Sequence, residues 1–406
     1  MAHRFLEFLP FAPFSAFDPP SSDFTLKTFL ISCGGTGGHL SPGIALAEGL
    51  RARGHRVTLF ISHKKIDARL IEKYPELSFV RIPGAPFGLH PATFVRFVWH
   101  QTHAFFFSLR QVRMLKPAGI VGFGGFTTAS LMVAGALKGI PVALHEANRV
   151  PGRAIRLLGR LARRVYLPPG IDLPQARSGA VRAAGLPVRR EIVRREREAA
   201  CATLGLDSQR PVLAVLGGSQ GASALNDWAR RNAEPLARAG IQLYCVTGPG
   251  KGDEGAQAYA GPGGMSVKAI FVSFSDRMAD ILSAADLVVS RAGAGTIAEL
   301  IRCHTPAVLV PFPQAADNHQ AANAAWLARE GGGTVVDQAN IAALDREVPL
   351  WMNDAARRAA SQARLRQLDQ ADPLTFMLDD LETLTAGRSS NGSGPSIAPA
   401  KAGVVS

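Results

Sequence analysis

Short apolar segments alternate with longer amphipathic segments along most of the chain. The apolar segments include LKTFLIS, RVTLFIS, GIVGF and PVALHE in the first half, and PVLAVLG, IQLYCVTG and ADLVVSR in the second half. Between them lie stretches such as PGIALAEGLRARGH, in which apolar residues recur at the spacing of one helical face. Continuous apolar runs are typical of strands that are buried on both faces. The pattern therefore predicts an α/β fold with doubly wound parallel sheets covered by helices.

One layout occurs twice. Residues 31–61 and residues 212–246 each read as an apolar strand, a Gly-Gly-[Ser/Thr]-x-Gly loop, a helix and a second strand. The loops begin at Gly34 and Gly217. A chain of 406 residues also exceeds the usual size of one hydrophobic core. The repeat therefore predicts two Rossmann-like domains, each opening with its own glycine-rich loop.

The expected boundaries follow from changes in composition. The charge balance changes at GLPVRREI, residues 185–192, where we place the linker. We expect an N-terminal domain of residues 25–188 and a C-terminal domain of residues 189–385. Residues 1–24 do not have the composition of a secretory signal, which favours a flexible leader or a misassigned start. The Ser/Gly/Ala-rich residues 386–406 are typical of a disordered tail.

Charge is distributed unevenly between the halves. Residues 1–190 hold 25 lysines and arginines against 9 acidic residues, whereas residues 191–406 hold 20 against 23. The net charge of +13 therefore comes from the N-terminal half. Such a half is suited to an anionic partner, and nucleic acid, anionic lipid and phosphorylated substrates are all compatible with it.

Two segments bear on membrane attachment. Residues 118–137 are uncharged and long enough to span a bilayer, but GFGGF interrupts them, so strand, glycine loop and helix is the better interpretation. Residues 86–116 mix aromatic residues such as Trp99 with cations such as Arg96 and Arg110. Core packing explains some of these aromatics, and the flanking cations suit a helix that dips into an anionic membrane surface. A later basic stretch, either a solvated face or an electrostatic anchor, contains Arg153, Arg156, Arg160, Arg163 and Arg164.

Three glycine clusters are candidate anion sites. A glycine loop before a helix leaves backbone N–H groups unpaired at the positive end of the helix dipole. The loops at Gly34 and Gly217 match neither a Walker A motif nor a dinucleotide fingerprint, which argues against an NAD-dependent oxidoreductase. A third cluster, GFGGFTTAS at residues 122–130, would let two loops of one sheet hold a diphosphate. The alternative interpretation of each single loop is a tight packing turn that binds no ligand.

Polar side chains gather at the ends of predicted strands. His39 closes the first loop and is either a packing or capping group, or a base or hydroxyl contact. Asn148 follows the strand PVALHE, at the edge where open α/β sheets bind ligands. Glu299 lies in the first turns of a helix, where it either complements the dipole or holds the hydroxyls of a ribose. The group around Gln320 is typical of a sugar-binding edge.

We expect no metal ion and no cofactor. No Asp-x-Asp pair occurs in the chain, although a metal-dependent nucleotide-sugar enzyme is expected to carry one. Helix N-termini and Arg189 would neutralise a leaving diphosphate instead. The cysteines, Cys33, Cys201, Cys245 and Cys303, match no metal-binding spacing and no disulfide framework, which favours a reducing compartment.

Seven motifs occur in the order of one known family. They are GGTGGHLSPGIALA, GFGGFTTAS, HEANRVPG, GLPVR, GGSQGASALN, SRAGAGTIAE and PFPQAADNHQAANA. In this order the chain resembles the MurG proteins, the UDP-N-acetylglucosamine–N-acetylmuramyl-(pentapeptide) pyrophosphoryl-undecaprenol N-acetylglucosamine transferases, from about Leu26 to about Gln338. The resemblance implies a GT-B fold, with two Rossmann-like domains facing each other across a cleft.

The resemblance also implies a reaction and its partners. N-acetylglucosamine would move from UDP-N-acetylglucosamine to the C4 hydroxyl of the muramyl sugar of lipid I (undecaprenyl-pyrophosphoryl-MurNAc-pentapeptide). This inverting transfer gives lipid II for peptidoglycan synthesis. The enzyme would be peripheral, on an anionic membrane surface at the cytoplasmic face of the bacterial cell membrane, and would have no nucleic acid partner.

Residue roles follow from the same resemblance. His39 matches the proposed base or acceptor contact and Glu299 the ribose contact, and these are the two expected catalytic residues. The expected donor contacts are Thr36, Gly37, Gly38, Asn148, Arg189, Ser219, Ser275, Ala294, Gly295, Thr296, Ile297, Ala298, Glu299 and Gln320. The expected contacts to the acceptor diphosphate are Gly37, Gly38, Gly124 and Gly125.

The chain departs from the family pattern at three positions. Ser275 stands where a bulky aliphatic residue is common, a change that a backbone contact to uracil would survive. Ala147 stands where glutamine is common and Leu186 where asparagine is common. Two other functions keep the same fold: a nucleotide-sugar 2-epimerase, and a non-catalytic nucleotide-sugar or membrane-binding protein. The second is disfavoured because His39, Glu299 and Gln320 are all present.

Overall fold

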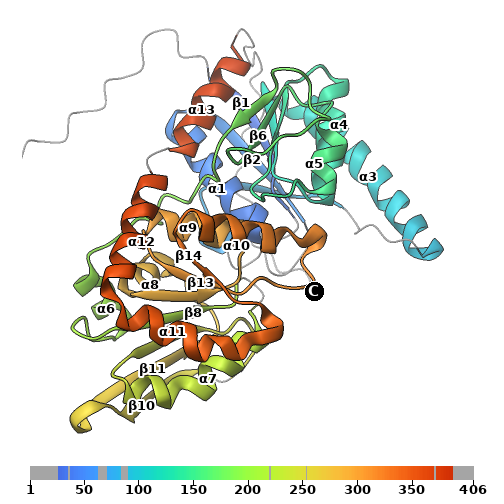
Figure 1. Cartoon of the computed structure of the whole chain (residues 1–406). Helices are drawn as coiled ribbons and strands as arrows, with labels where there is room; N and C mark the ends of the chain where they lie inside the picture. Colours follow the sequence, from blue (N-terminus) through green and yellow to red (C-terminus); the bar gives the residue numbers. More distant parts are fainter. Residues whose placement is uncertain are drawn as a thin grey trace, which may run out of the picture.

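The chain forms two α/β domains, one above the other in Figure 1. The computed structural model describes residues 26–34, 37–62, 71–83, 90–218, 221–252, 254–369 and 372–386. The expectation of two Rossmann-like domains with doubly wound sheets is confirmed. The predicted leader and all but the first residue of the predicted tail lie outside the described residues.

The N-terminal domain contains a seven-stranded sheet of order β3-β2-β1-β4-β5-β6-β7, in which every pair is parallel. Apolar residues alternate between its two faces: Phe29 and Ile31 pack under α1, whereas Leu30 packs under α3, α4 and α5. The strands are β1 Thr28–Ser32, β2 Arg56–Ile61, β3 Ser78–Arg81, β4 Gly119–Gly122, β5 Val142–His145, β6 Arg164–Leu167 and β7 Val181–Ala183. The helices are α1 Gly37–Ala52, α3 Pro91–Leu115, α4 Phe126–Leu137 and α5 Arg153–Leu158.

The C-terminal domain contains a second seven-stranded sheet, of order β10-β11-β9-β8-β12-β13-β14. Its pairs are parallel except that the edge strand β10 is antiparallel to β11, a hairpin that the sequence pattern did not predict. The strands are β8 Val212–Leu216, β9 Gln242–Val246, β10 Gly255–Ala260, β11 Ser266–Val272, β12 Leu287–Ser290, β13 Ala307–Leu309 and β14 Gly333–Val335. The helices are α6 Arg197–Leu204, α7 Ser223–Arg238, α8 Met278–Ala284, α9 Ala294–Arg302, α10 His319–Arg329, α11 Leu344–Asn353 and α12 Ala355–Leu368, with short 3-10 turns at Pro262–Gly264, Ala316–Asn318 and Gln338–Ala343.

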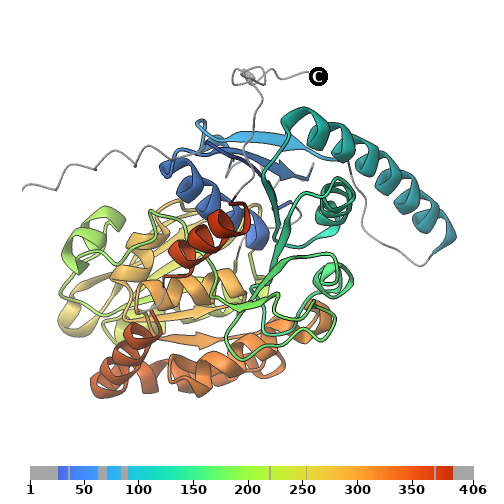
Figure 2. The same ribbon diagram turned by 90° about the horizontal axis from the view of Figure 1, so that it is seen from above.

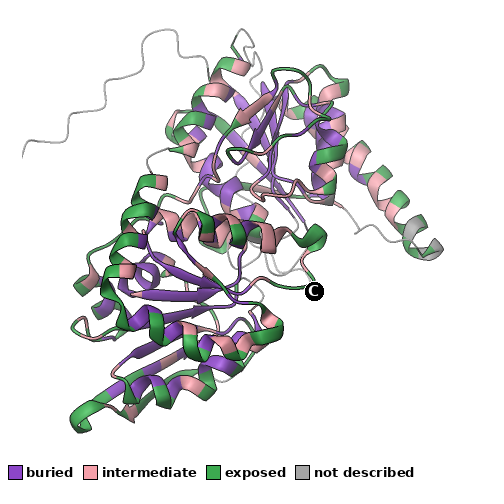
Figure 3. Cartoon of the chain, in the orientation of Figure 1, coloured by how far each residue is buried: buried purple, intermediate pink, exposed green. Residues whose placement is uncertain are grey.

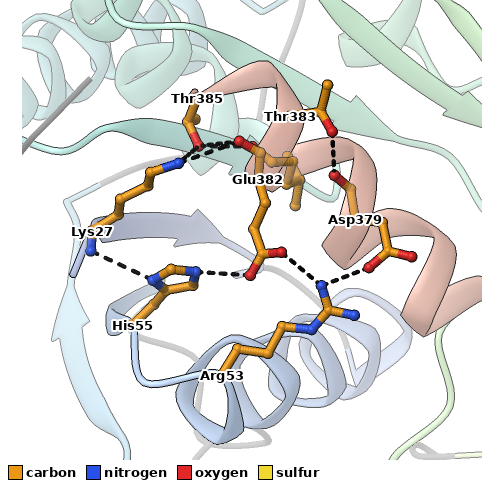
Figure 4. Close-up of polar contacts among 8 residues, drawn as sticks. Lys27, Arg53, His55, Asp379, Glu382, Thr383 and Thr385 are labelled. Atoms are coloured by element: carbon orange, nitrogen blue, oxygen red, sulfur yellow. Dashed lines mark hydrogen bonds and ion pairs between the residues drawn. The ribbon is translucent and has the colours of Figure 1, made fainter. Parts of the chain in front are cut away.

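The last described helix, α13 (Pro373–Leu384), packs in the N-terminal domain, although the sequence pattern assigned it to the C-terminal one (Figure 1). Its buried face, which includes Met377 and Leu378, covers the same core as α1. Polar contacts flank this face: the Glu382 carboxylate lies 2.8 Å from Arg53 Nη1 and 3.0 Å from His55 Nε2 (Figure 4). Because the apolar face of α13 packs against α1, the chain returns from the C-terminal domain to the N-terminal domain before this helix.

The apolar segment of residues 118–137 divides as predicted into β4, a glycine turn and α4. No helix among the described residues has the length and apolar content needed to cross a membrane. Helix α3 projects from the body of the N-terminal domain in both views of the molecule (Figures 1 and 2).

Candidate functional site

The two predicted glycine loops follow β1 and β8. Each of these strands is one of the two neighbours between which the strand order of its sheet changes direction. In the N-terminal sheet β1 lies between β2 and β4, and in the C-terminal sheet β8 lies between β9 and β12. Ligands of open α/β sheets bind in the crevice at such a switch point, beyond the carboxyl ends of the strands. The topology therefore gives each domain one candidate ligand-binding edge, and each edge carries a glycine loop.

The first glycine of each loop is required by backbone packing. A Cβ at Gly34 would lie 2.4 Å from the backbone nitrogen of Ser62, and a Cβ at Gly217 would lie 2.4 Å from that of Ala222. Both distances are too short for a real side chain. The turn interpretation therefore accounts for these two glycines. Of the predicted contacts further along the loops, Thr36 and Ser219 lie outside the described residues.

The β1 and β4 loops meet around the imidazole of His39. Gly124 and Gly125 have φ values of 97° and 79°, which favour glycine, and Gly125 is the N-cap of α4. A Cβ at Gly124 would lie 3.3 Å from His39 Nε2, and one at Gly125 would lie 3.6 Å from His39 Nδ1. Thr127 Oγ1 donates to the Gly34 carbonyl at 3.4 Å and ties the two loops together. The two loops that were predicted to cradle a diphosphate are therefore neighbours, with the histidine between them.

Gly37 and Gly38 form the first turn of α1, and Phe126 and Thr127 form that of α4. The first N–H groups of a helix have no acceptor within that helix, and the N-termini of these two helices adjoin the loops that contain Gly124 and Gly125. This arrangement provides N–H groups and two positive dipole ends for an anion.

In the C-terminal domain the start of α9 faces open space. Gly293 is its N-cap, and a Cβ built on Gly295 meets no atom within 4 Å among the described residues. Ala294, Gly295, Thr296 and Ala298 are partly exposed, whereas the Ile297 side chain is buried in the core. Any contact of Ile297 with a ligand would therefore involve its backbone.

Arg189 and Glu299 are paired beside this helix start. Arg189 Nη2 lies 3.5 Å from Glu299 Oε1, and Arg189 Nη1 lies 3.1 Å from Glu191 Oε1. The side chains of Arg189 and Glu299 are only 12% and 16% exposed. Burial raises the pKa of Glu299, and Arg189 opposes that rise. Burial works to lower the pKa of Arg189, but Glu299, Tyr74 and Glu191 outweigh it and raise the pKa, so the guanidinium stays charged.

The loop after β5 is organised by Glu146. Its carboxylate accepts hydrogen bonds from the backbone nitrogen of Asn148 at 2.9 Å, from Asn148 Nδ2 at 2.9 Å and from the backbone nitrogen of Gly152 at 2.7 Å. The Asn148 side-chain oxygen in turn accepts from Asn323 Nδ2 of α10 at 3.0 Å. Asn148, predicted as a donor contact, is therefore held at the boundary between the two domains. Burial lowers the pKa of the neighbouring His145, whose Nε2 contacts the Gly185 carbonyl at 3.0 Å.

The remaining predicted residues occupy loop and helix ends of the C-terminal domain. Gln320 lies in the first turn of α10, and its side-chain oxygen accepts from the backbone nitrogen of Phe312 at 2.9 Å. Ser275 lies between β11 and α8, where its hydroxyl accepts from the backbone nitrogen of Arg277 at 3.1 Å. The same hydroxyl is also a hydrogen-bond partner of the Tyr244 side chain on β9. The ligand contacts assigned to both residues stay predictions.

The sequence analysis missed Arg291, which directly follows β12. Arg291 is buried, and its guanidinium donates to the carbonyls of Val310 at 3.1 Å and Pro311 at 3.3 Å. Burial lowers the pKa of Arg291. A buried cation at the carboxyl end of a strand adjoining the switch point adds positive potential to this edge. The motif SRAGAGTIAEL contained the signal, an arginine immediately after a strand that is otherwise apolar.

No group of three or more His, Cys, Asp or Glu side chains in the described parts of the chain is arranged to hold a metal ion. The four cysteines are all buried and free. The candidate site thus consists of backbone donors, the arginines Arg189 and Arg291, the carboxylates that hold them or shape the loops, the imidazole of His39 and a few carboxamides.

Two Rossmann-like domains, each with a glycine loop at the switch point of its parallel sheet, form the GT-B fold that nucleotide-sugar glycosyltransferases use. The N-terminal domain of glycosyltransferase family 28 matches residues 29–167, and the C-terminal domain of that family matches residues 212–372. The chain belongs to glycosyltransferase family 28 and, within it, to the MurG family that its motifs resemble.

Individual relatives support this assignment. A protein of Opitutus terrae is 55% identical over 368 residues, which cover 91% of this chain and 98% of that protein. It is named UDP-N-acetylglucosamine–N-acetylmuramyl-(pentapeptide) pyrophosphoryl-undecaprenol N-acetylglucosamine transferase. A protein of the same name from Clavibacter michiganensis subsp. michiganensis is 38% identical and covers 83% of this chain and 91% of its own length. The crystal structure of Acinetobacter baumannii MurG superposes on this chain with a TM-score of 0.65 at 24% sequence identity. The match covers 88% of this chain and 99% of the MurG chain, and it supports the fold.

Proposed function

We propose that the chain transfers N-acetylglucosamine from UDP-N-acetylglucosamine to the C4 hydroxyl of the muramyl sugar of lipid I. The anomeric configuration inverts and UDP leaves. The observation that carries this proposal is the 55% identity to the Opitutus terrae transferase over nearly the whole of both chains. The two switch-point edges support it, because each provides donors for one of the two diphosphates that the reaction requires.

The C-terminal domain is suited to the nucleotide sugar. The diphosphate of UDP would lie against the backbone donors at the start of α9, where Arg189 adds a permanent positive charge. Glu299, in the second turn of α9, would accept hydrogen bonds from the ribose hydroxyls. Gln320 and Asn148 would contact the N-acetylglucosamine ring. The leaving diphosphate is thus stabilised by fixed dipoles and a guanidinium.

The N-terminal domain is suited to the acceptor. Its diphosphate would bind across the loops that contain Gly37, Gly38, Gly124 and Gly125, against the N-termini of α1 and α4. His39 lies between these loops. From there its imidazole would take the proton of the attacking C4 hydroxyl as that oxygen bonds to the anomeric carbon and the bond to UDP breaks. A single displacement of this kind inverts the anomeric centre.

Helix α3 is suited to the lipid surface on which the acceptor is held. Trp99 and Phe106 are 65% and 63% exposed, and Val95 and Val98 are exposed as well. Figure 3 shows exposed and partly exposed residues along the projecting helix. Phe105, by contrast, packs against the core. The cations Arg96, Arg110 and Arg113 are exposed along the helix. Apolar side chains beside cations suit peripheral attachment to the anionic, cytoplasmic face of the cell membrane.

The decisive experiment is turnover of the purified full chain with UDP-N-acetylglucosamine and a lipid I analogue. Release of UDP together with a β-1,4-linked disaccharide product would support the transfer. Release of UDP with a free 2-epimer of the sugar would instead indicate an epimerase. Binding of UDP-N-acetylglucosamine without turnover, in the presence of the acceptor and anionic vesicles, would indicate a non-catalytic binding protein.

A further inference from the structure

A seam of contacts joins the two domains beside the proposed donor site. On the N-terminal side it is formed by the loop after β5 and by α5, and on the C-terminal side by α10 and the turn before it. Asn323 Oδ1 accepts from the backbone nitrogen of Arg149 at 2.9 Å, and the Arg149 guanidinium lies 5.2 Å from the centroid of the Trp326 ring. Arg156 Nη2 lies 2.8 Å from Asp317 Oδ2. Among the described residues of α5, no other side chain comes that close to Asp317.

Asp317 belongs to a turn with an unusual backbone. Asp317 has φ 50° and ψ 25°, and Asn318 has φ 54° and ψ 28°, so two successive residues other than glycine are left-handed. Asp and Asn are the side chains that best tolerate this region, but it is unfavourable for both. Such a conformation persists only where its surroundings hold it. The turn leads directly into α10, whose second residue is Gln320.

We propose that Arg156 is a positioning residue for the donor sugar. From the N-terminal domain it holds the carboxylate of Asp317, and through it the left-handed turn that sets the start of α10 and hence the carboxamide of Gln320. This inference rests on the proposed contact between Gln320 and the N-acetylglucosamine ring. Beside the contact already assigned to Asn148, it gives the acceptor domain a second, indirect part in binding the donor.

The geometry favours Arg156 over the other arginines of the basic stretch. Arg153 Nη2 is 3.9 Å from Asp317, and its side chain is 81% exposed, against 42% for Arg156. Arg164 is engaged elsewhere, 2.9 Å from Asp380 of α13. An ion pair this exposed adds little to global stability, so its loss should leave the folded protein intact while releasing the local turn.

The test compares the kinetics of variants with both substrates. We expect Arg156→Ala to raise KM for UDP-N-acetylglucosamine about three- to tenfold, the range in which removal of one partly exposed charge pair and its turn falls. KM for the lipid I analogue and the melting temperature should not change. Arg156→Lys should restore most of the donor affinity. Asp317→Asn, which keeps a residue that tolerates the left-handed region, should reproduce the effect of Arg156→Ala. The double variant should show no further increase.

Arg160→Ala is the matched control, because Arg160 is an exposed arginine of the same basic stretch. Its substitution should alter neither KM. The inference is overturned if Arg156→Ala leaves the donor KM unchanged, or raises the acceptor KM or weakens binding to anionic vesicles instead. Effects of Arg156→Ala and Asp317→Asn that multiply would also overturn it. A Gln320→Ala variant with an unchanged donor KM would show that the proposed donor site itself is wrong. A raised donor KM in Gln320→Ala beside an unchanged one in Arg156→Ala would reject the positioning role alone.

Discussion

Substitution of Glu299 by alanine should separate nucleotide recognition from folding. If Glu299 accepts two ribose hydroxyls, the variant loses two hydrogen bonds to a charged group, each of about 1.5–3 kcal/mol. The sum corresponds to a fall of about 10²- to 10⁴-fold in kcat/KM for UDP-N-acetylglucosamine. Stability should fall much less, because Arg189 keeps a second carboxylate, that of Glu191, at 3.1 Å. We expect a loss of about 1–2 kcal/mol in the free energy of unfolding.

The assay is inhibition by UDP and by its 2′-deoxy and 3′-deoxy analogues. The wild-type protein should bind UDP more tightly than either analogue, and Glu299→Ala should bind all three alike. Glu191→Gln is the matched control: it removes the negative charge that pairs with the same arginine and weakens the contact with the Tyr74 hydroxyl, which donates to Glu191 at 2.6 Å, but it leaves α9 unchanged. That control should still discriminate. Equal discrimination by Glu299→Ala and the wild type, or wild-type kcat/KM in Glu299→Ala, would refute the ribose contact.

The protonation of Glu299 adds a pH dependence to the same prediction. Burial raises its pKa above the ordinary 4.5, so the carboxylate takes up a proton at a higher pH than an exposed glutamate does. A protonated Glu299 neither pairs with Arg189 nor accepts from both hydroxyls as a carboxylate would. As the pH falls through this raised pKa, kcat/KM for the donor should therefore fall, with a midpoint above 4.5. Glu299→Gln should lack that acid limb.

Three other substitutions test separate parts of the molecule. His39→Ala should lower kcat by about 10²- to 10⁴-fold in assays with the lipid I analogue if the imidazole is the general base, and donor KM should stay near the wild-type value. Joint replacement of Trp99 and Phe106 by serine should weaken binding to anionic vesicles by at least about tenfold, while turnover of a water-soluble acceptor analogue is kept. Asp380→Ala should lower the free energy of unfolding by about 2–4 kcal/mol, because it leaves a buried tyrosine hydroxyl of β6 without its acceptor, whereas the exposed Asp379→Ala should cost less than about 1 kcal/mol in a denaturant titration.

The elements that the sequence predicted well are those whose signal is local. Strands such as β1, β8 and β12 are buried along their whole length, so they appear as unbroken apolar runs. The edge strand β10, GAQAYA, is mostly exposed and made of small or polar residues, so no such signal marks it. Its pairing depends on the hairpin with β11 rather than on burial. The glycine loops were found for a similar reason, since a turn against a neighbouring backbone excludes a Cβ at Gly34 and Gly217.

The pairs that assemble the candidate site could not be predicted in this way. Arg189 and Glu299 are 110 residues apart in the sequence, Arg156 and Asp317 are 161 apart, and Asn323 is 175 residues from its partner in the loop after β5. Arg189, Glu299 and Asn148 were predicted one by one as site residues, but none of these pairings was predicted. Which residues meet depends on how one domain is placed against the other, and no local periodicity encodes that placement.

The placement is fixed where the chain passes between the domains. It does so at the linker and again before α13, whose Leu378 side chain fits against α1 because residue 49 is glycine: a Cβ there would lie 2.8 Å from the leucine methyl. Arg189 lies in the first of these crossings, where its guanidinium donates to the Tyr74 hydroxyl of the N-terminal domain at 3.5 Å and lies 3.5 Å from the Glu299 carboxylate of the C-terminal domain. A residue in the crossing is positioned by both domains at once. The position of the cation that would face the leaving diphosphate therefore depends on how the two domains dock, and the packing of α13 on the core of the N-terminal domain is part of that docking.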